Sequence, residues 1–208
     1  MPPHEPSLLL TQREWYRRKT AFMERTLGPE HNVVTHAIIA YAFGGPLDLY
    51  YFPNGIYGTA IATKELSETP NEGSSNRVFR SYELVMFTRH PFRLDDADDS
   101  TKPFGRAHRN TTAILNRVAR YSATERLNPF DTFEFSEDME RVGGKCLIFD
   151  GLESYSDDMV QDFGLLAVIE IFRSEMQYAR EFGGSKLVEK LKAQGSYPCS
   201  DLNREPAA

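Results

Sequence analysis

The sequence feature that most restricts the fold is a nearly unbroken apolar run, GLLAVIEIF, at residues 164–172. Its length suits a single β-strand and falls well short of the roughly 20 apolar residues that span a bilayer. A run of this kind is typical of a strand that is buried on both faces. The chain must therefore supply a sheet around this strand and further elements to cover it.

Several other segments are candidate strands, because they are rich in β-branched and aromatic residues. Turn residues separate the early ones, for example Gly44-Gly45-Pro46 and the segment 53–55. Strands are expected at 33–42, 47–52, 56–63, 78–88, 133–136 and 145–149. The short connections between the early strands predict an antiparallel meander or a mixed sheet.

Helices are expected at 11–27, 107–121, 173–182 and from 185 onward, where apolar residues recur at helical spacing. Thr11 and Glu14 form a capping box at the first helix, and Ser185 is placed to cap the last. No internal repeat, long linker or composition break divides the chain. The sequence predicts one α+β domain over residues 11–197, with flexible tails at 1–10 and 198–208.

Composition argues against several classes of protein. The 208 residues are 40% hydrophobic and 26% charged, as in globular proteins. The net charge of −6 makes nucleic acid a poor partner, because phosphate is repelled. The start of the chain does not resemble a signal peptide, and no membrane span is indicated. Two widely separated cysteines favour a reducing compartment, so the protein is expected in the cytoplasm.

The sequence shows no familiar catalytic or metal-binding motif, and it predicts no catalytic residue, metal or cofactor. His36 is expected to be packed or exposed, and His108 to face solvent. Cys146 is expected to be a small buried side chain, although a dyad with a histidine from elsewhere in the chain stays open. The acidic stretch at 95–99 lacks the ligand order of a calcium loop.

Acidic residues are concentrated in the segment 131–162. This segment contains ten acidic residues and only two basic residues, Arg141 and Lys145, so its net charge is −8. Loops 136–144 and 151–162, if they lie on one side, form an acidic surface that speeds capture of a basic partner. If they point apart, their charge only favours solubility. The candidate partner-binding residues are Glu137, Asp138, Glu153, Asp157 and Asp158.

The order of these motifs resembles that of suppressor of fused domains over about residues 33–195. IEIFRSEMQYAREFGGSKLVEKL at 169–191 is similar to the closing signature, with Glu175, Gly183 and Leu187 at matching places. LYYFPNGIYGTAIATKELSE, RSYELVMF and ILNRVARY resemble earlier strands and the central helix. Glu83 lies in the second of these segments. In the first, Glu65 stands where the family has glycine.

The resemblance implies a suppressor-of-fused-like α+β fold and a protein-binding role without catalysis. The family is similar to the N-terminal domain of an animal Hedgehog-pathway repressor that binds a transcription factor. Free-standing bacterial members are thought to be immunity proteins that neutralise toxins. A chain of this size is similar to those members, which implies a protein partner such as a basic toxin.

Several alternatives stay open at this point. The protein is a scaffold or regulator that binds a peptide in a groove or at a sheet edge, or a hydrolase of unfamiliar arrangement. The oligomeric state is not indicated. Four residues in the family motifs are expected to be structural, with the carboxylates pairing with backbone amides or an arginine. These residues are Glu83, Glu175, Gly183 and Leu187.

Overall fold

The apolar run forms strand β7, Phe163–Ile171, and all nine of its residues are buried. In the computed structural model, which describes residues 10–55 and 58–208, β7 lies parallel to β4, Ser81–Thr88. All eight residues of β4 are buried as well. The prediction of a strand covered on both faces is therefore confirmed.

Within the described residues the sheet has seven strands in the order β1-β2-β3-β4-β7-β6-β5. Only the β4–β7 pair is parallel, and the other neighbours are antiparallel. The mixed sheet expected from the sequence is confirmed. The remaining strands are β1 (Val34–Thr35), β2 (Leu49–Gly55), β3 (Gly58–Ala62), β5 (Thr132–Glu134) and β6 (Cys146–Tyr155).

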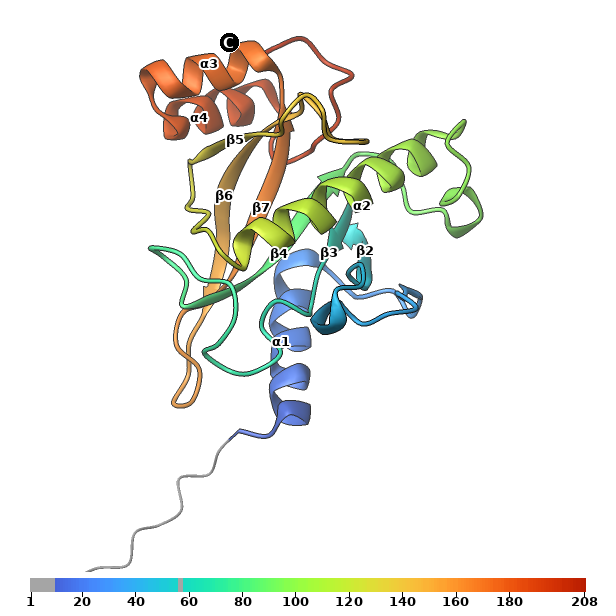
Figure 1. Cartoon of the computed structure of the whole chain (residues 1–208), viewed down its shortest axis with the longest axis vertical. Helices are drawn as coiled ribbons and strands as arrows, with labels where there is room; N and C mark the ends of the chain where they lie inside the picture. The colour runs from blue at the N-terminus through green and yellow to red at the C-terminus, as the bar shows by residue number, and fades with distance from the viewer. Residues whose placement is uncertain (1–9, 56–57) are drawn as a thin grey trace, which may run out of the picture.

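Helices cover both faces of this sheet (Figure 1). Helices α1 (Gln12–Leu27), α3 (Arg173–Phe182) and α4 (Gly184–Gln194) share one core with Leu165 and Ala167 of β7. Helix α2 (Pro103–Ser122) crosses the other face and shares a second core with Leu166 and Val168. Successive residues of β7 thus enter different cores, as the alternation of a strand requires. None of the described helices is long and apolar enough to cross a membrane.

Three predicted helix starts, those of α1, α4 and α2, agree with the structure to different degrees. The capping box of α1 is present, with the Thr11 hydroxyl accepting from the Glu14 amide. Ser185 is not a cap, because α4 begins one residue earlier and follows Gly183 directly. Helix α2 begins at Pro103 and not at 107, since proline is well suited to the first turn of a helix.

The segment 33–42 was expected to be a strand, but only Val34 and Thr35 pair with β2. The Ala37 amide donates instead to the Asp48 carboxylate, 2.8 Å away, so the strand ladder stops there. The chain then forms a loop containing the short 3-10 helix η1 (Tyr41–Phe43). A second 3-10 turn, η2 (Leu94–Asp96), precedes α2. β6 extends to Tyr155, into a region expected to be a loop.

The two segments that were expected to be flexible tails are described to different extents by the structure. Most of the predicted N-terminal tail, residues 1–9, lies outside the described residues, as do residues 56–57 of the strand expected at 56–63. The segment 198–208 packs on the body: Ser200 donates its amide to Phe87, and Arg204 pairs with Glu175. This packing differs from the free tail that the sequence indicated.

Candidate functional site

The family-motif residue Glu83 lies at the centre of a fully buried ion-pair network. Its side chain is 0% exposed, and its carboxylate pairs with the Lys19 ammonium at 3.0 Å. It also accepts hydrogen bonds from the Thr63 hydroxyl, the Leu66 amide, and the amide and hydroxyl of Ser67. These contacts join α1 to the turn after β3, and they leave no part of the carboxylate open to a partner.

The second motif carboxylate, Glu175, is also buried and occupied by contacts within the chain. It accepts from the Phe172 amide at 2.9 Å, from the Ala207 amide at 2.7 Å, and from Arg204 through both carboxylate oxygens. Burial acts to raise the pKa of Glu175, but these hydrogen bonds lower it. Gly183 separates α3 from α4 with a φ of +101°, and Leu187 is completely buried.

The five candidate acidic residues do not lie on one surface. Loop 136–144, with Glu137 and Asp138, precedes β6, whereas Asp157 and Asp158 follow it. The ten residues of β6 place the two loops roughly 30 Å apart, at opposite ends of the sheet (Figure 1). Glu153 is exposed and lies near the later end, where the pairing with β7 is irregular.

Two of these acidic residues are bonded within the chain. Glu137 pairs with Arg173 at 2.7 Å, and Asp157 pairs with Arg18 at 2.6 Å. Burial acts to raise the pKa of Asp157, but hydrogen bonds from Tyr155, from two backbone amides and from Arg18 lower it to about 2. A partner-binding role for the five residues stays a prediction, and any such role involves two separate surfaces.

The residues weighed as catalytic candidates have ordinary packing roles. His108 was expected to face solvent, but it is 8% exposed and contacts the Tyr51 hydroxyl at 2.8 Å. The prediction was wrong because His108 lies one turn before Thr111 and two turns before Leu115, which are both buried, so it shares their side of α2. Burial lowers the pKa of His108. Cys146 is buried, and burial raises the pKa of its thiol, the opposite of an activated nucleophile.

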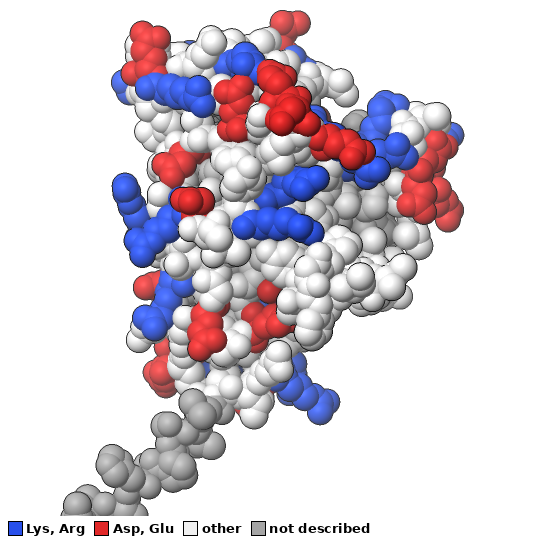
Figure 2. Space-filling model, in the orientation of Figure 1, with Lys and Arg blue, Asp and Glu red and all other residues white. Residues whose placement is uncertain are grey.

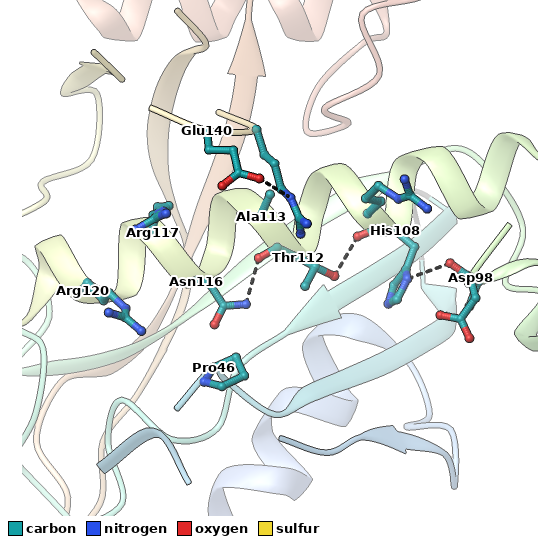
Figure 3. A pocket seen from close by; sticks show the side chains of 12 residues that line it. Pro46, Asp98, His108, Thr112, Ala113, Asn116, Arg117, Arg120 and Glu140 are labelled. Atoms are coloured by element: carbon teal, nitrogen blue, oxygen red, sulfur yellow. Dashed lines mark hydrogen bonds and ion pairs between the residues drawn. The ribbon is translucent and has the colours of Figure 1, made fainter. Parts of the chain in front are cut away.

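A groove of about 490 Å³ follows the exposed side of α2 (Figure 3). Pro46 lies on one side of the helix and Glu140 on the other, and Arg141 also lines the groove. The helix itself supplies most of the lining, with polar and basic side chains at helical spacing and one alanine. These are His108, Arg109, Thr112, Ala113, Asn116, Arg117 and Arg120.

The amphipathic pattern of α2 explains why these side chains face outward. Ile114, Leu115 and Val118 are at most 1% exposed and pack on the sheet. The residues between them must then lie on the solvent side, because a helix turns about 100° per residue. The Asn116 side chain holds the segment that precedes β2, since its Oδ1 atom accepts from the Leu47 amide at 2.7 Å.

The groove is positively charged on a protein whose net charge is −6. Four arginines line it against two acidic residues, Asp98 and Glu140. Within the described part of the chain, Arg109 and Arg117 make no ion pair or hydrogen bond, and both are exposed. Figure 2 shows Lys and Arg side chains crossing the middle of this face, where Figure 1 places α2.

The groove was not predicted from the sequence, because the net charge of a segment does not show which side of a helix its charged residues occupy. The helix has arginines at 109, 117 and 120, which share one side at a spacing of eight and three residues. A helical projection of 107–121 would have shown them together. Their convergence with Arg141, 21 residues farther along the chain than Arg120, is a result of the tertiary structure.

Comparison with solved structures identifies the fold. A chain in the crystal structure of the Sufu–Fu complex matches with a TM-score of 0.60 and 14% identity, over 98% of this chain and 93% of that one. The chain has a suppressor-of-fused-like fold. Drosophila Suppressor of Fused matches with a TM-score of 0.57 and 13% identity, over 92% of this chain and 49% of that chain. The sequence matches no family model and no curated protein.

Proposed function

We propose that this suppressor-of-fused-like protein is a protein-binding module and that the α2 groove binds an acidic segment of its partner. The fold is shared with a protein crystallised in a complex with another protein, which supports a binding role. The accessible cationic side chains of the groove support an acidic ligand, because arginine forms strong, directional pairs with carboxylates.

The observation that carries this proposal is that Arg109 and Arg117 are exposed and have no ion-pair or hydrogen-bond partner among residues 10–55 and 58–208. Five of the ten acidic residues in the segment 131–162 already pair with basic side chains of the same protein, as Glu134 does with Arg173 at 2.8 Å. No described acidic residue pairs with an arginine of α2 in this way, although the chain has an excess of acidic residues. A carboxylate from outside the chain is the complementary partner.

The dimensions of the groove suit a short linear segment. Arg109 and Arg120 are eleven residues apart on one helix, which is about 16 Å at 1.5 Å per residue. An extended peptide covers this distance with about five residues. Alternate side chains of such a peptide point to one side, so two or three carboxylates meet the row of arginines.

We also propose that binding inhibits or regulates the partner, the role that the resemblance implies for free-standing bacterial members. The charge of −8 in the segment 131–162 supports a basic partner such as a toxin, whereas the α2 groove supports an acidic one. Since the acidic loops lie at opposite ends of β6, the groove is the better-defined surface. The immunity role stays a prediction.

The test uses three pools of fluorescein-labelled 12-residue peptides with net charges of −4, 0 and +4. Fluorescence anisotropy should show binding of the acidic pool alone, and its affinity should fall as salt increases from 50 to 300 mM. The variant R109E/R117E/R120E should weaken binding at least about thirtyfold, equivalent to about 2 kcal/mol.

The matched control is R13E/R17E/K186E, which makes the same change in net charge on exposed positions of α1 and α4. These helices cover the other face of the sheet. Equal losses in the two triple variants would show that only net charge matters, and would refute the groove. Preferential binding of the basic pool would instead favour the acidic loops.

A further inference from the structure

A loop beside the α2 groove exposes an unusual amount of apolar surface. The side chains of Ile38, Ile39 and Phe43 are 104%, 56% and 85% exposed. Ala40 and Ala42, between Ile39 and Phe43, are exposed too. Single exposed apolar residues are normal, but a cluster of this kind is typical of an interaction site. We call the residues 36–46 the apolar loop.

Side-chain contacts hold the second half of the apolar loop against α2. The Tyr41 hydroxyl donates to the Ala119 carbonyl at 2.9 Å, and Arg120 donates to the Gly44 carbonyl at 3.1 Å. Pro46 then lines the groove. Phe43 is therefore only one residue from the backbone that Arg120 contacts, so apolar and basic surfaces adjoin.

The first half of the loop is held by Asp48. Its carboxylate accepts from the Ala37 amide at 2.8 Å and pairs with the His36 ring at 2.7 Å. Both ends of the loop are thus fastened, and its apolar side chains are presented without a cost in ordering a free segment.

Two glycines set the shape of the loop. Gly44 has a φ of +87°, a conformation that favours glycine. At Gly45 an added Cβ would lie 1.7 Å from the Ile39 carbonyl oxygen, so no other residue fits without moving the backbone. The loop therefore folds back on itself, and the one aromatic ring that packs inward is that of Tyr41.

We propose that the apolar loop and the α2 groove form one composite docking surface for an amphipathic acidic segment of a partner protein. The carboxylates of the segment pair with Arg109, Arg117 and Arg120. A large aliphatic or aromatic side chain at one end of it packs on Ile38, Ile39 and Phe43. This inference rests on the proposed function and specifies its ligand: acidic residues followed or preceded by an apolar anchor.

The apolar contact accounts for selectivity that arginines alone do not provide. Each exposed charge pair contributes up to about fivefold in affinity (about 1 kcal/mol), is screened by salt, and forms equally well with any acidic segment. Burial of one large apolar side chain contributes more, and it distinguishes one acidic segment from another. The arginines of α2 therefore attract acidic segments, and the apolar loop selects among them.

The experiment selects displayed random 12-residue peptides on the wild-type protein, and then measures Kd for the enriched peptides by anisotropy. We expect enrichment of Asp or Glu together with Leu, Ile, Phe or Trp. The variant I38S/F43S should weaken these peptides about tenfold or more and leave the fold unchanged, because both side chains are exposed. The control V78S/F182S removes two exposed apolar side chains elsewhere and should have no effect.

The outcomes separate the two proposals. Enriched peptides that are acidic without any apolar preference, or that bind I38S/F43S normally, overturn the composite surface and leave the basic groove standing. An absence of enriched acidic peptides overturns both. Acidic, apolar peptides that lose affinity in I38S/F43S and in R117E/R120E, but not in the control, support both.

Discussion

Replacing Lys19 with methionine should destabilise the fold strongly, because it leaves a buried carboxylate without its counter-ion. The Lys19 side chain is 1% exposed and that of Glu83 is 0% exposed. The ammonium donates to the Lys64 carbonyl at 2.6 Å, to the Ser67 carbonyl at 3.0 Å and to Glu83 at 3.0 Å. Methionine fills a similar volume but supplies none of these donors.

The magnitude follows from what remains after the change. The Ser67 carbonyl still accepts from the Trp15 indole at 2.7 Å, and Glu83 keeps its bonds to Thr63, Leu66 and Ser67. The main loss is the charge pairing, and removing one partner of a buried ion pair costs about 3–5 kcal/mol. A domain of this size has about 5–15 kcal/mol of stability in total. The melting temperature should fall by about 10 °C.

Urea unfolding followed by circular dichroism measures this change. The matched control is Arg17→Met on the exposed side of α1, which should stay within about 0.5 kcal/mol of wild type. The double variant K19M/E83Q should lose less than the sum of the two single variants, since its members share the interaction. A loss below 1 kcal/mol in K19M, or strict additivity in the double variant, would refute the reasoning.

Three further predictions concern the loops and the C-terminal segment. Asp157→Asn should cost about 1 kcal/mol at pH 7. The pKa of Asp157 is lowered to about 2, so its carboxylate stabilises the folded state above pH 4 and loses this effect as pH falls toward 2. The free energy of unfolding of the variant should lack this dependence on pH. Gly45→Ala should abolish the selectivity for apolar anchors while acidic peptides still bind, as the same anisotropy assay would show. Arg204→Met should cost about 3 kcal/mol in urea unfolding, because Glu175 loses its only ion-pair partner among the described residues; an unchanged midpoint would show that the backbone amides suffice.

Local sequence patterns determined much of the fold because the forces behind them act over a few residues. The apolar run at 164–172 required a strand buried on both faces, and the Thr11–Glu14 capping box marked the start of α1. Helices at 173–182 and after Gly183 followed from spacing and glycine position. The suppressor-of-fused-like fold that the motifs resembled is the one that the structure has.

The failed predictions involve partners that are distant in the sequence. Residues 36–42 have the composition of a strand. However, the Ala37 amide donates to the Asp48 carboxylate and not to a neighbouring strand. The sequence left open whether the two acidic loops of the segment 131–162 share one surface, and the ten-residue strand β6 between them places them at opposite ends of the sheet. The net charge of a sequence segment does not show how far apart β6 places the two acidic loops.

The sequence alone thus determined most of the helices and strands, the burial of β7 and the excess of acidic residues, since each depends on residue type and short-range periodicity. Only the tertiary structure decided which charges meet. It buried Lys19 against Glu83 across 64 positions and set Arg141 beside the arginines of α2. It also turned Ile38 and Phe43 outward. The physical reason is that electrostatic and apolar contacts depend on distance in space, which packing of the helices on the sheet fixes.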